Sequence, residues 1–302
     1  MSSTLFTRIR PRTAVATLAT GGIALCIFTR LMITDAHAAS HPTPPKVFGG
    51  GPSFIALPLE SAEQVNHDTK RLRFKLPTPD SVSGLPLTSS LLTVSWPKGS
   101  WTPVARPYTP ISTSDEPGHI DFLVKKYPNG KQSTHLHALQ PGDTLRFAVP
   151  LKGPQWKPSP SSSPEHITLV AGGAGITPVY QLLQGILADK GDLTTTMTLV
   201  YGVNTEKDTL LRDEFRALEK QHPGRFRAVY TVTAPEQDGQ QEIRKGRVTK
   251  ELLDELVPAS QRGRAYVCGP PSMEASLTGG RGASDGGILQ QLGYRKVDIF
   301  RF

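Results

Sequence analysis

Two short segments of the chain carry residue types that could bind redox cofactors. Residues 106–110 (RPYTP) combine an arginine fork for a pyrophosphate, an aromatic ring that can pack on a flavin, and a hydroxyl that can bond the flavin ring edge. About 65 residues later, residues 172–178 (GGAGITP) follow an apolar run. Small residues at such a point let the backbone approach a dinucleotide pyrophosphate at a helix N-terminus. Each motif alone is weak, but their order and spacing predict an enzyme that passes electrons between two bound cofactors.

The glycine motif departs from the usual dinucleotide fingerprint. It reads GxGxxP instead of GxGxxG, so Pro178 is expected in the first helical turn, where a missing N–H costs little. An ordinary glycine turn between a strand and a helix is the alternative interpretation. In the same way, an RPYT string can be a plain surface turn.

The elements expected around the first motif are short strands. Apolar runs broken by Pro, Gly and Ser predict closely spaced strands with little helix, which indicates an antiparallel barrel or sandwich. These runs are residues 53–60, 70–76, 91–96, 119–127 and 143–149. Residues 157–165 (KPSPSSSPE) then mark a domain boundary.

After this boundary the pattern alternates between strand and helix. Strands are predicted at 166–171, 197–201, 226–233 and 265–268, and helices at 179–189, 208–221 and 250–257, the last capped by Thr249. Leu210, Leu211, Phe215 and Leu218 would share one side of the second helix. This alternation predicts a parallel sheet with helices on both faces and ligands at the carboxyl ends of its strands.

The first 35 residues are predicted to be a targeting segment and membrane anchor. Residues 1–13 are rich in Ser, Thr and Arg without an acid, as in mitochondrial targeting segments, and residues 14–33 are largely apolar. A cleaved secretory signal is an alternative, because residues 36–38 (AHA) resemble a cleavage site, and another kind of membrane anchor is a third interpretation. Residues 36–52 are interpreted as a linker.

Composition and charge limit the remaining classes. The 302 residues are enough for two domains, and no internal repeat is evident. Four arginines precede the first acid, Asp35, and without them the net charge of +8 falls to about +4. This excess is too mild to indicate a nucleic-acid partner, but it favours an acidic protein partner.

Cysteine and histidine usage gives no indication of a metal site. Cys26 lies in the apolar segment and Cys268 near the C-terminus, which excludes an internal disulfide, an iron–sulfur cluster or a structural zinc site in the soluble part. His135 and His137 would point to different faces of a helix. No metal is therefore predicted.

From residue 46 to residue 302 the chain resembles the NADH-cytochrome b5 reductase family, especially its fungal mitochondrial branch, within the ferredoxin-reductase-like flavoproteins. The resemblance rests on collinear segments: RPYTP, VKKYPNGKQSTHLHAL (124–139), PGDTLRF (141–147), GGAGITP, VCGPPSM (267–273) and the terminal LGYRKVDIFRF. It implies a Greek-key antiparallel β-barrel for FAD at 53–156 and an α/β parallel-sheet domain for NAD at 166–302.

The resemblance also implies roles for particular residues. Thr109, Thr177 and Cys268 would act at the reacting rings, and residues 130–133 would wrap the pyrophosphate where a helix begins, with Ser133 as its cap. The predicted FAD-binding residues are Arg106, Pro107, Tyr108, Thr109, Lys125, Tyr127, Gly130, Lys131, Gln132, Ser133, Thr177 and Phe302. The predicted NAD-binding residues are Gly173, Gly175, Cys268, Gly269 and Pro270.

Cys268 has a second interpretation outside the family. A lone Cys at a strand end is usually a small buried hydrophobe. Within the family pattern it would shape nicotinamide placement without a covalent intermediate.

The chain departs from the family pattern at several positions. Gln132 stands where Met is usual, and Ala174 stands where Thr is usual. The Gly153-Pro154 pair lies farther beyond the strand predicted at 143–149 than it usually does in the family. The third strand of the nucleotide domain ends in TVTAP without the acid that NADH-specific relatives tend to carry. This absence predicts relaxed discrimination against NADPH.

The expected function is a reductase anchored in a mitochondrial membrane, the outer one being favoured. It would take hydride from NADH, or from NADPH, onto FAD and pass single electrons to cytochrome b5 or a similar acidic haem protein. One alternative is a related membrane flavoprotein that reduces haem during cytochrome c maturation, or a quinone. A non-catalytic two-domain scaffold is another.

Overall fold

A computed structural model describes residues 43–49, 54–158, 164–234, 243–280 and 286–302. The predicted anchor (1–35) and most of the predicted linker (36–52) lie outside these residues. Pro44 to Phe302 belong to one compact unit. Among the residues described, no helix has the length and apolar character needed to cross a bilayer.

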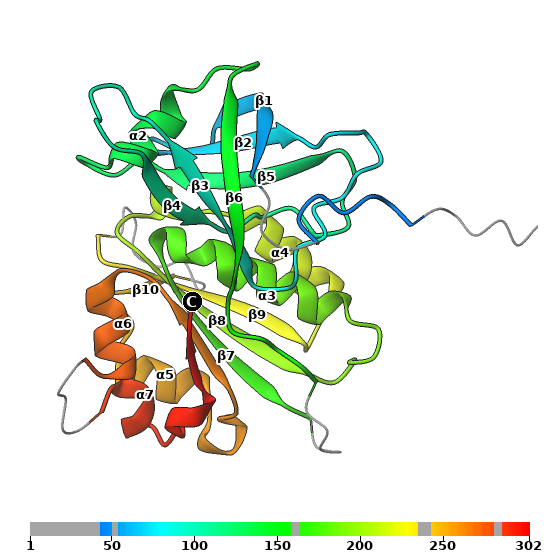
Figure 1. The fold of residues 1–302 in the computed structure, drawn as a ribbon. Helices are drawn as coiled ribbons and strands as arrows, with labels where there is room; N and C mark the ends of the chain where they lie inside the picture. Colours follow the sequence, from blue (N-terminus) through cyan, green and yellow to red (C-terminus); the bar gives the residue numbers. More distant parts are fainter. Residues whose placement is uncertain (1–42, 50–53, 159–163, 235–242, 281–285) are drawn as a thin grey trace, which may run out of the picture. The chain divides into compact units, whose positions relative to one another are not determined.

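The first half is an antiparallel domain, as predicted (Figure 1). Its six strands form one sheet in the order β4-β3-β6-β1-β2-β5, and a short helix, α2 (Lys131–Ala138), follows β5. β4 and β5 stand at the two ends of this order, so the hydrogen-bonded ladder is open between them. The strands are β1 (Ile55–Gln64), β2 (Thr69–Lys75), β3 (Ser89–Ser95), β4 (Val104–Tyr108), β5 (His119–Lys125) and β6 (Thr144–Lys152).

Alternating burial along the strands builds the core of this domain. Successive residues of β3 alternate between buried and half-buried, because side chains of a strand point to opposite faces. Three phenylalanines meet at the centre, where the Phe147 ring lies 5.3 Å from Phe74 and 5.6 Å from Phe122. Leu136 packs α2 against the same core. The helix that begins beside the first motif is thereby fixed to the sheet.

The RPYTP motif enters a strand that the apolar runs did not predict. β4 pairs with β3, with Arg106 opposite Thr93 and Pro107 opposite Leu92. Proline cannot donate to a ladder and is confined to edge strands, and β4 is at the edge of its sheet. After β4, the Ile111 N–H donates to the Asp121 carbonyl at 2.9 Å, so β5 holds the chain that follows Thr109.

The second half is a parallel domain, also as predicted. Its sheet has the order β10-β9-β8-β7-β11-β12, and every pair of neighbouring strands is parallel. The strands are β7 (His166–Gly172), β8 (Thr196–Val203), β9 (Phe226–Val232), β10 (Ile243–Lys245), β11 (Ala265–Cys268) and β12 (Ile299–Arg301). The short β10 and β12 were not predicted.

Helices cover both faces of the parallel sheet (Figure 1). On one face, Val179, Leu183 and Phe215 pack α3 and α4 onto the strands. On the other face, Leu253 and Leu289 belong to the core formed with α5, α6 and α7. The helices are α3 (Ile176–Ala188), α4 (Arg212–Gln221), α5 (Lys250–Leu256), α6 (Pro271–Thr278) and α7 (Ile288–Gln291), with 3₁₀ turns η1 (Gly173–Gly175), η2 (Glu206–Asp208), η3 (Ala259–Gln261) and η4 (Lys296–Asp298).

The helix predicted at 208–221 begins four residues later than expected. Asp208 ends the 3₁₀ turn η2, where its Oδ2 accepts hydrogen bonds from the Thr205 N–H at 2.9 Å and the Thr205 hydroxyl at 2.8 Å. The chain then passes through a left-handed residue, Leu211, before α4 starts. Leu210 and Leu211 nevertheless belong to the same core cluster as Phe215, although the prediction that they are helical was wrong.

At α5 the predicted cap is confirmed. The Thr249 hydroxyl oxygen accepts the Leu252 N–H at 3.2 Å, and the helix ends at Leu256, one residue earlier than expected.

Candidate cofactor site

One cavity of about 1660 Å³ lies where the two domains meet. The antiparallel domain contributes β4, the end of β5 and the start of α2, while the parallel domain contributes the glycine turn after β7 and the segment after β11. Every residue predicted to bind FAD or NAD lines this cavity, from Arg106 in β4 to the terminal Phe302. The structure thus brings both motifs to one place, and the individual roles stay predictions.

Arg106 and the start of α2 face the cavity from the antiparallel domain. Arg106 is exposed, and its Nη1 donates to the neighbouring Ala105 carbonyl at 2.8 Å. Gly130 is the N-cap of α2, and the first turn of this helix contains no acid. The first N–H groups of a helix have no intrahelical acceptor, so with Arg106 and Lys131 they make this wall attractive to an anion.

Ser133 does not cap α2, which corrects the sequence prediction. Its hydroxyl lies inside the first turn, where it accepts the Tyr127 N–H at 3.2 Å and donates to the Gly130 carbonyl at 3.1 Å. A Cβ on Gly130 would lie 2.4 Å from this hydroxyl. Ser133 therefore closes the turn that leads into α2, and a glycine at the N-cap leaves room for its hydroxyl.

Gln132, one of the departures from the family pattern, is buried in a polar network. Its Nε2 donates to the Thr93 hydroxyl at 2.9 Å, and its Oε1 accepts from the Ser95 hydroxyl at 2.5 Å. Thr93 in turn donates to the Arg106 carbonyl at 3.0 Å. Gln132 thus connects α2 to β3 and, through Thr93, to the strand that carries Arg106.

The glycines of the second motif serve different steric needs. A Cβ on Gly175 would lie 2.4 Å from the Cys268 carbonyl oxygen, and one on Gly172 would lie 2.5 Å from the Met273 sulfur. Both glycines therefore permit close packing against the segment that follows β11. Gly173 differs, because it has a positive φ of 52° and open space where a Cβ would be. Of the three, Gly173 is the one that leaves room on the cavity side.

The three residues predicted at the reacting rings are partly or fully withdrawn from solvent. Thr109 is half-buried just after β4, and Thr177 is buried in the first turn of α3, where its hydroxyl donates to the Ala174 carbonyl at 3.3 Å. Burial raises the pKa of the Cys268 thiol to about 12, and the negative charge of Glu274 adds to this shift. Cys268 is therefore a neutral thiol at physiological pH.

Phe302 reaches the cavity because the chain end is held by β11. The Phe302 N–H donates to the Val267 carbonyl at 3.3 Å, and its ring lies 6.1 Å from Tyr266. Tyr266 stacks on Phe300 at 4.8 Å. This short aromatic stack fixes the position of the last residue.

Two further departures also shape the cavity wall. β6 continues to Lys152 instead of ending near residue 149, and Leu151, Lys152 and Gly153 line the cavity as a result. The Gly153 N–H donates to the Thr88 carbonyl at 2.9 Å, which places this extension against β3. Ala174 lines the cavity without the hydroxyl of the usual Thr.

Several polar residues of the lining carry no recognisable signal in the sequence. Asp208 is the only acid among the described residues of the lining. The basic members are Arg106, Lys125, Lys131, Lys152 and Arg247. A lining with this charge balance suits ligands that carry phosphates. Asp208 could not be found from sequence spacing, because its partner Lys125 is 83 residues away.

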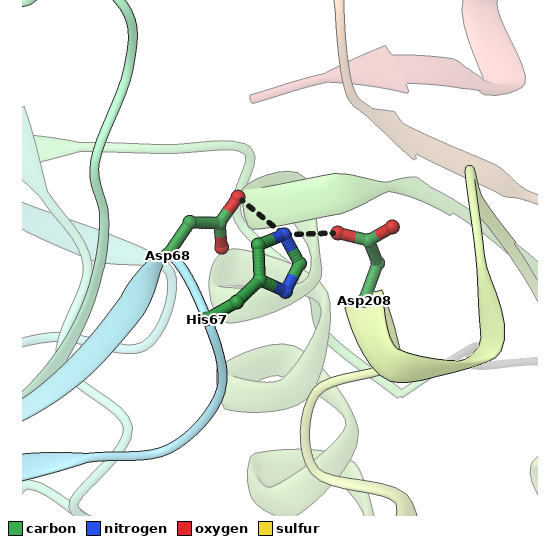
Figure 2. Close-up of side chains that lie close together, drawn as sticks. All are labelled: His67, Asp68 and Asp208. Carbon is green, nitrogen blue, oxygen red and sulfur yellow. Dashed lines mark ion pairs between the residues drawn. The ribbon is translucent and has the colours of Figure 1, made fainter.

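His67, Asp68 and Asp208 form the one group in the described chain whose side chains are close enough to hold a metal ion (Figure 2). The two carboxylates, however, already share a cation. Lys125 Nζ lies 2.8 Å from Asp68 Oδ2 and 3.2 Å from Asp208 Oδ1. Burial alone would lower the pKa of Lys125, but its bonds to these carboxylates raise it, so the ammonium stays charged. His137 is not part of this group, and its Nε2 lies 2.7 Å from the Val124 carbonyl oxygen.

Comparison with known proteins agrees with this division into two cofactor-binding halves. The family described as the oxidoreductase FAD-binding domain matches residues 56–156, and the one described as the oxidoreductase NAD-binding domain matches residues 169–278. An NADH-cytochrome b5 reductase 2 of Pyricularia oryzae is 43% identical over 256 residues, which cover 82% of this chain and 76% of that protein. The chain belongs to the NADH-cytochrome b5 reductase family. The resemblance noted from the sequence is thereby confirmed.

Further members and solved structures extend the match. The NADH-cytochrome b5 reductase 2 of Phaeosphaeria nodorum is also 43% identical, over 84% of this chain and 76% of that protein. The cytochrome b5 reductase domain of Ulva prolifera nitrate reductase superposes with a TM-score of 0.73 at 29% identity, covering 86% of this chain and all of that one. The CS-b5R domains of human Ncb5or give a TM-score of 0.66 at 25% identity, over 83% of this chain and 70% of that one.

Family membership identifies the protein as an oxidoreductase that uses FAD and NADH. The residues of this family member suit both cofactors. The exposed Arg106, Lys131 and the acid-free start of α2 offer cationic and N–H donors for the FAD pyrophosphate. On the opposite wall, Gly173 leaves open space where a side chain would be, and Gly269 and Pro270 line the same cavity, which leaves room for a nicotinamide dinucleotide to approach the backbone.

Proposed function

We propose that this family member transfers hydride from NADH to FAD and then delivers single electrons to cytochrome b5 or a similar haem protein. The observation that supports this proposal is the shared cavity, which is lined by the predicted flavin residues of one domain and the predicted nicotinamide residues of the other. Two ligands held in one cavity react with a much higher effective concentration than free molecules.

When bound, FAD supplies the two-electron to one-electron conversion that the side chains themselves cannot perform. The protein residues bind and orient. Arg106 and Lys131 would hold phosphate oxygens, and Thr109 and Thr177 would flank the ring region from opposite domains. Cys268 remains a neutral thiol because burial raises its pKa to about 12, so it acts through shape and not as a nucleophile.

We also propose that residues 1–35 anchor the protein in a mitochondrial membrane, with the outer membrane favoured. The basic, acid-free start and the apolar segment at 14–33 support this assignment. Cytochrome b5 is the proposed partner because the relatives carry that acceptor in their names, and the basic excess of the chain suits an acidic haem protein.

The proposed activity can be tested with the purified full chain. We expect a yellow protein whose flavin absorbance bleaches on addition of NADH and recovers on addition of oxidised cytochrome b5. A panel of cytochrome b5, free haem and a quinone then identifies the acceptor from the kcat/KM for each. Faster reduction of haem or a quinone would replace the proposed acceptor, and a colourless protein that NADH does not change would contradict the reductase function.

We further propose that the site accepts NADPH as well as NADH. Thr233 and Arg247 line the cavity after β9 and β10, and the described lining has no acid there that would repel a 2′-phosphate. In the variant Thr233→Asp, the NADPH kcat/KM should fall about tenfold or more while that for NADH changes little, because the new carboxylate would repel the 2′-phosphate, at a cost of about 1–4 kcal/mol for unit charges about 4 Å apart. Thr233→Asn is the matched neutral control. A steep NADH preference in the unchanged protein would contradict the proposal.

A further inference from the structure

A group of polar side chains connects the two domains along one wall of the cofactor cavity. The turn between β1 and β2 supplies Asn66, His67 and Asp68, the end of β5 supplies Lys125, and the parallel domain supplies Asp208 at the end of η2. Figure 2 shows His67 between the two carboxylates. Both Lys125 and Asp208 line the cavity. We call these five residues the interdomain bridge.

Lys125 is the centre of the interdomain bridge. Its ammonium lies 2.8 Å from Asp68 in its own domain and 3.2 Å from Asp208 in the other domain. The side chains of Lys125, Asp68 and Asp208 are 19%, 22% and 9% exposed, so these ion pairs are partly shielded from solvent. Pairs of this kind are screened less by salt than exposed surface pairs.

The side chain of Asp208 is oriented by Thr205 as well as by Lys125. Its Oδ2 is taken up by the two bonds from Thr205, which leaves Oδ1 directed at Lys125 and, at 3.6 Å, at His67 Nε2. The hydrogen bonds from Thr205 and Lys125 outweigh burial and lower the pKa of Asp208, so the carboxylate is charged at neutral pH. The geometry of η2 is thus transmitted to a side chain of the antiparallel domain.

A neighbouring bond supports the same connection. Asn66 Nδ2 donates to the Lys207 carbonyl at 3.0 Å, and Asn66 Oδ1 accepts the Asp68 N–H at 3.1 Å. The Lys126 N–H donates to the Asp68 carbonyl at 2.7 Å, which ties the turn to the end of β5. The residues around Lys125 are therefore joined to η2 by a backbone contact as well as by the ion pair.

We propose that Asp208 is a positioning residue for hydride transfer, which acts by holding Lys125 and the β1–β2 turn against the parallel domain and so sets the separation of the two cofactor sites. This inference rests on the proposed hydride-transfer function. Effective concentrations in such sites depend steeply on geometry, and a misplacement of about 1 Å can cost up to about 100-fold in rate.

The test uses the full chain with FAD bound and the isosteric variant Asp208→Asn. Its amide can keep an acceptor for Thr205 but removes the charge that holds Lys125. We expect the rate of flavin bleaching at saturating NADH to fall about tenfold, while FAD content and Tm stay near those of the unchanged protein. Asp213→Asn removes the charge of a side chain that is 95% exposed in α4, and it should leave the bleaching rate, FAD content and Tm unchanged.

A second readout does not depend on catalysis. In Asp208→Asn, amide hydrogen exchange of residues 66–70 should accelerate about tenfold, while amides of the buried strand β7 keep their protection. A general loss of stability would raise exchange in both segments. If NADH bleaches the flavin of Asp208→Asn as fast as that of the unchanged protein, the inference is contradicted. It is also contradicted if the amides of residues 66–70 exchange at the unchanged rate.

A double variant tests whether Asp208 acts through Lys125. Lys125→Met should also slow bleaching, and adding Asp208→Asn to it should cause little further loss, because the second change removes an interaction that is already gone. Additive losses would contradict this route. If NADH fails to bleach the unchanged protein, the proposed function is wrong, and the exchange measurement still decides whether the interdomain bridge holds the turn.

Discussion

At the level of single residues, Cys268 is a thiol placed among the predicted nicotinamide residues but kept uncharged. Burial raises the pKa of the Cys268 thiol to about 12. A covalent role would need the thiolate, which is the nucleophilic form and which this site does not stabilise. The Cys268 carbonyl oxygen would also lie 2.4 Å from a Cβ on Gly175, which shows how tightly this strand end packs against the glycine turn. The side chain therefore contributes through its volume at the cavity surface.

This environment makes a prediction for Cys268→Ser. The hydroxyl is smaller and more strongly hydrated than the thiol, so we expect flavin reduction by NADH to slow about tenfold through altered placement of the nicotinamide, while FAD stays bound. Rapid-mixing spectroscopy measures the reduction rate, and the flavin-to-protein absorbance ratio measures FAD content. Cys26→Ser, outside both domains, should leave the rate unchanged. An unaltered rate in Cys268→Ser would contradict this role.

Some residues of the site could be predicted from their spacing in the sequence, and others could not. The two motifs identified residues from both walls of the cavity, because each motif is local and its chemistry can be read from adjacent side chains. Asp208 could not be found in this way, because its significance comes from Lys125, which is distant in the chain. Ser133 was misassigned for a related reason, since its partner Tyr127 is set by the turn geometry and not by helix capping rules.

At the level of elements, the position of α2 depends on Gln132. This residue joins α2 to two hydroxyls of β3, and one of them, Thr93, also bonds the Arg106 carbonyl of β4. The family's usual Met would place an apolar group there. The sequence identified the departure, but only the fold shows that the new amide has compensating partners.

Gln132→Met should therefore destabilise the protein by about 1–3 kcal/mol, because it leaves the buried Ser95 hydroxyl without its acceptor. The double variant Gln132→Met with Ser95→Ala should recover part of this loss, since both polar partners are then removed. Urea unfolding measures both effects. If the double variant is less stable than the single one, the loss comes from packing and not from the unpaired hydroxyl.

The ladder between β2 and β5 contains a buried charge with a predictable pH dependence. Asp121 is fully buried and accepts hydrogen bonds from Arg71 and Arg73. Burial alone would raise the pKa of Asp121. The two guanidinium groups lower this pKa by more than burial raises it, so the net shift is downward. A lowered pKa in the folded state means that the unfolded chain takes up the proton first as the pH falls. The stabilisation is therefore present above about pH 4, the usual Asp value, and is lost below it.

Asp121→Asn tests this sign. At pH 7 the variant should be less stable by about 1–3 kcal/mol, a range that allows for the partial exposure of both arginines. The difference from the unchanged protein should shrink as the pH falls from 4 toward 2. Urea midpoints across this range measure it, with the exposed Asp213→Asn as control. A difference that grows in acid would contradict the assigned shift.

The strand predictions failed where an element is defined by its neighbours. β4 contains Arg106-Pro107 and none of its five residues is buried, so its state is set by pairing with β3 and by its place at the sheet edge. β12 has three residues and pairs with β11, a partner separated from it by two helices. The longer apolar runs, such as β7 and β8, were predicted correctly because their burial on both faces is visible in the sequence itself.

At the level of the whole molecule, two domains with different sheets present one cavity, and the predicted partner must approach from outside. The chain carries a net charge of +8, and about +4 remains without the four arginines that precede Asp35. An acidic haem protein would be attracted over a distance of about 10 Å at 0.1 M salt, but over only about 3 Å at 1 M. Electrostatic attraction of this kind affects the rate of association more than the final affinity.

Reduction of cytochrome b5 should therefore depend on ionic strength in a way that reduction of a neutral acceptor does not. We expect kcat/KM for cytochrome b5 to fall about tenfold between 0.1 M and 1 M salt, because the steering term is screened. A neutral quinone provides the matched acceptor, and bleaching of the flavin at saturating NADH reports the preceding step alone. If the quinone shows the same loss, salt acts on the protein or on hydride transfer, and the positive net charge does not steer the partner. If cytochrome b5 alone shows it, the charge of the whole molecule contributes to acceptor choice.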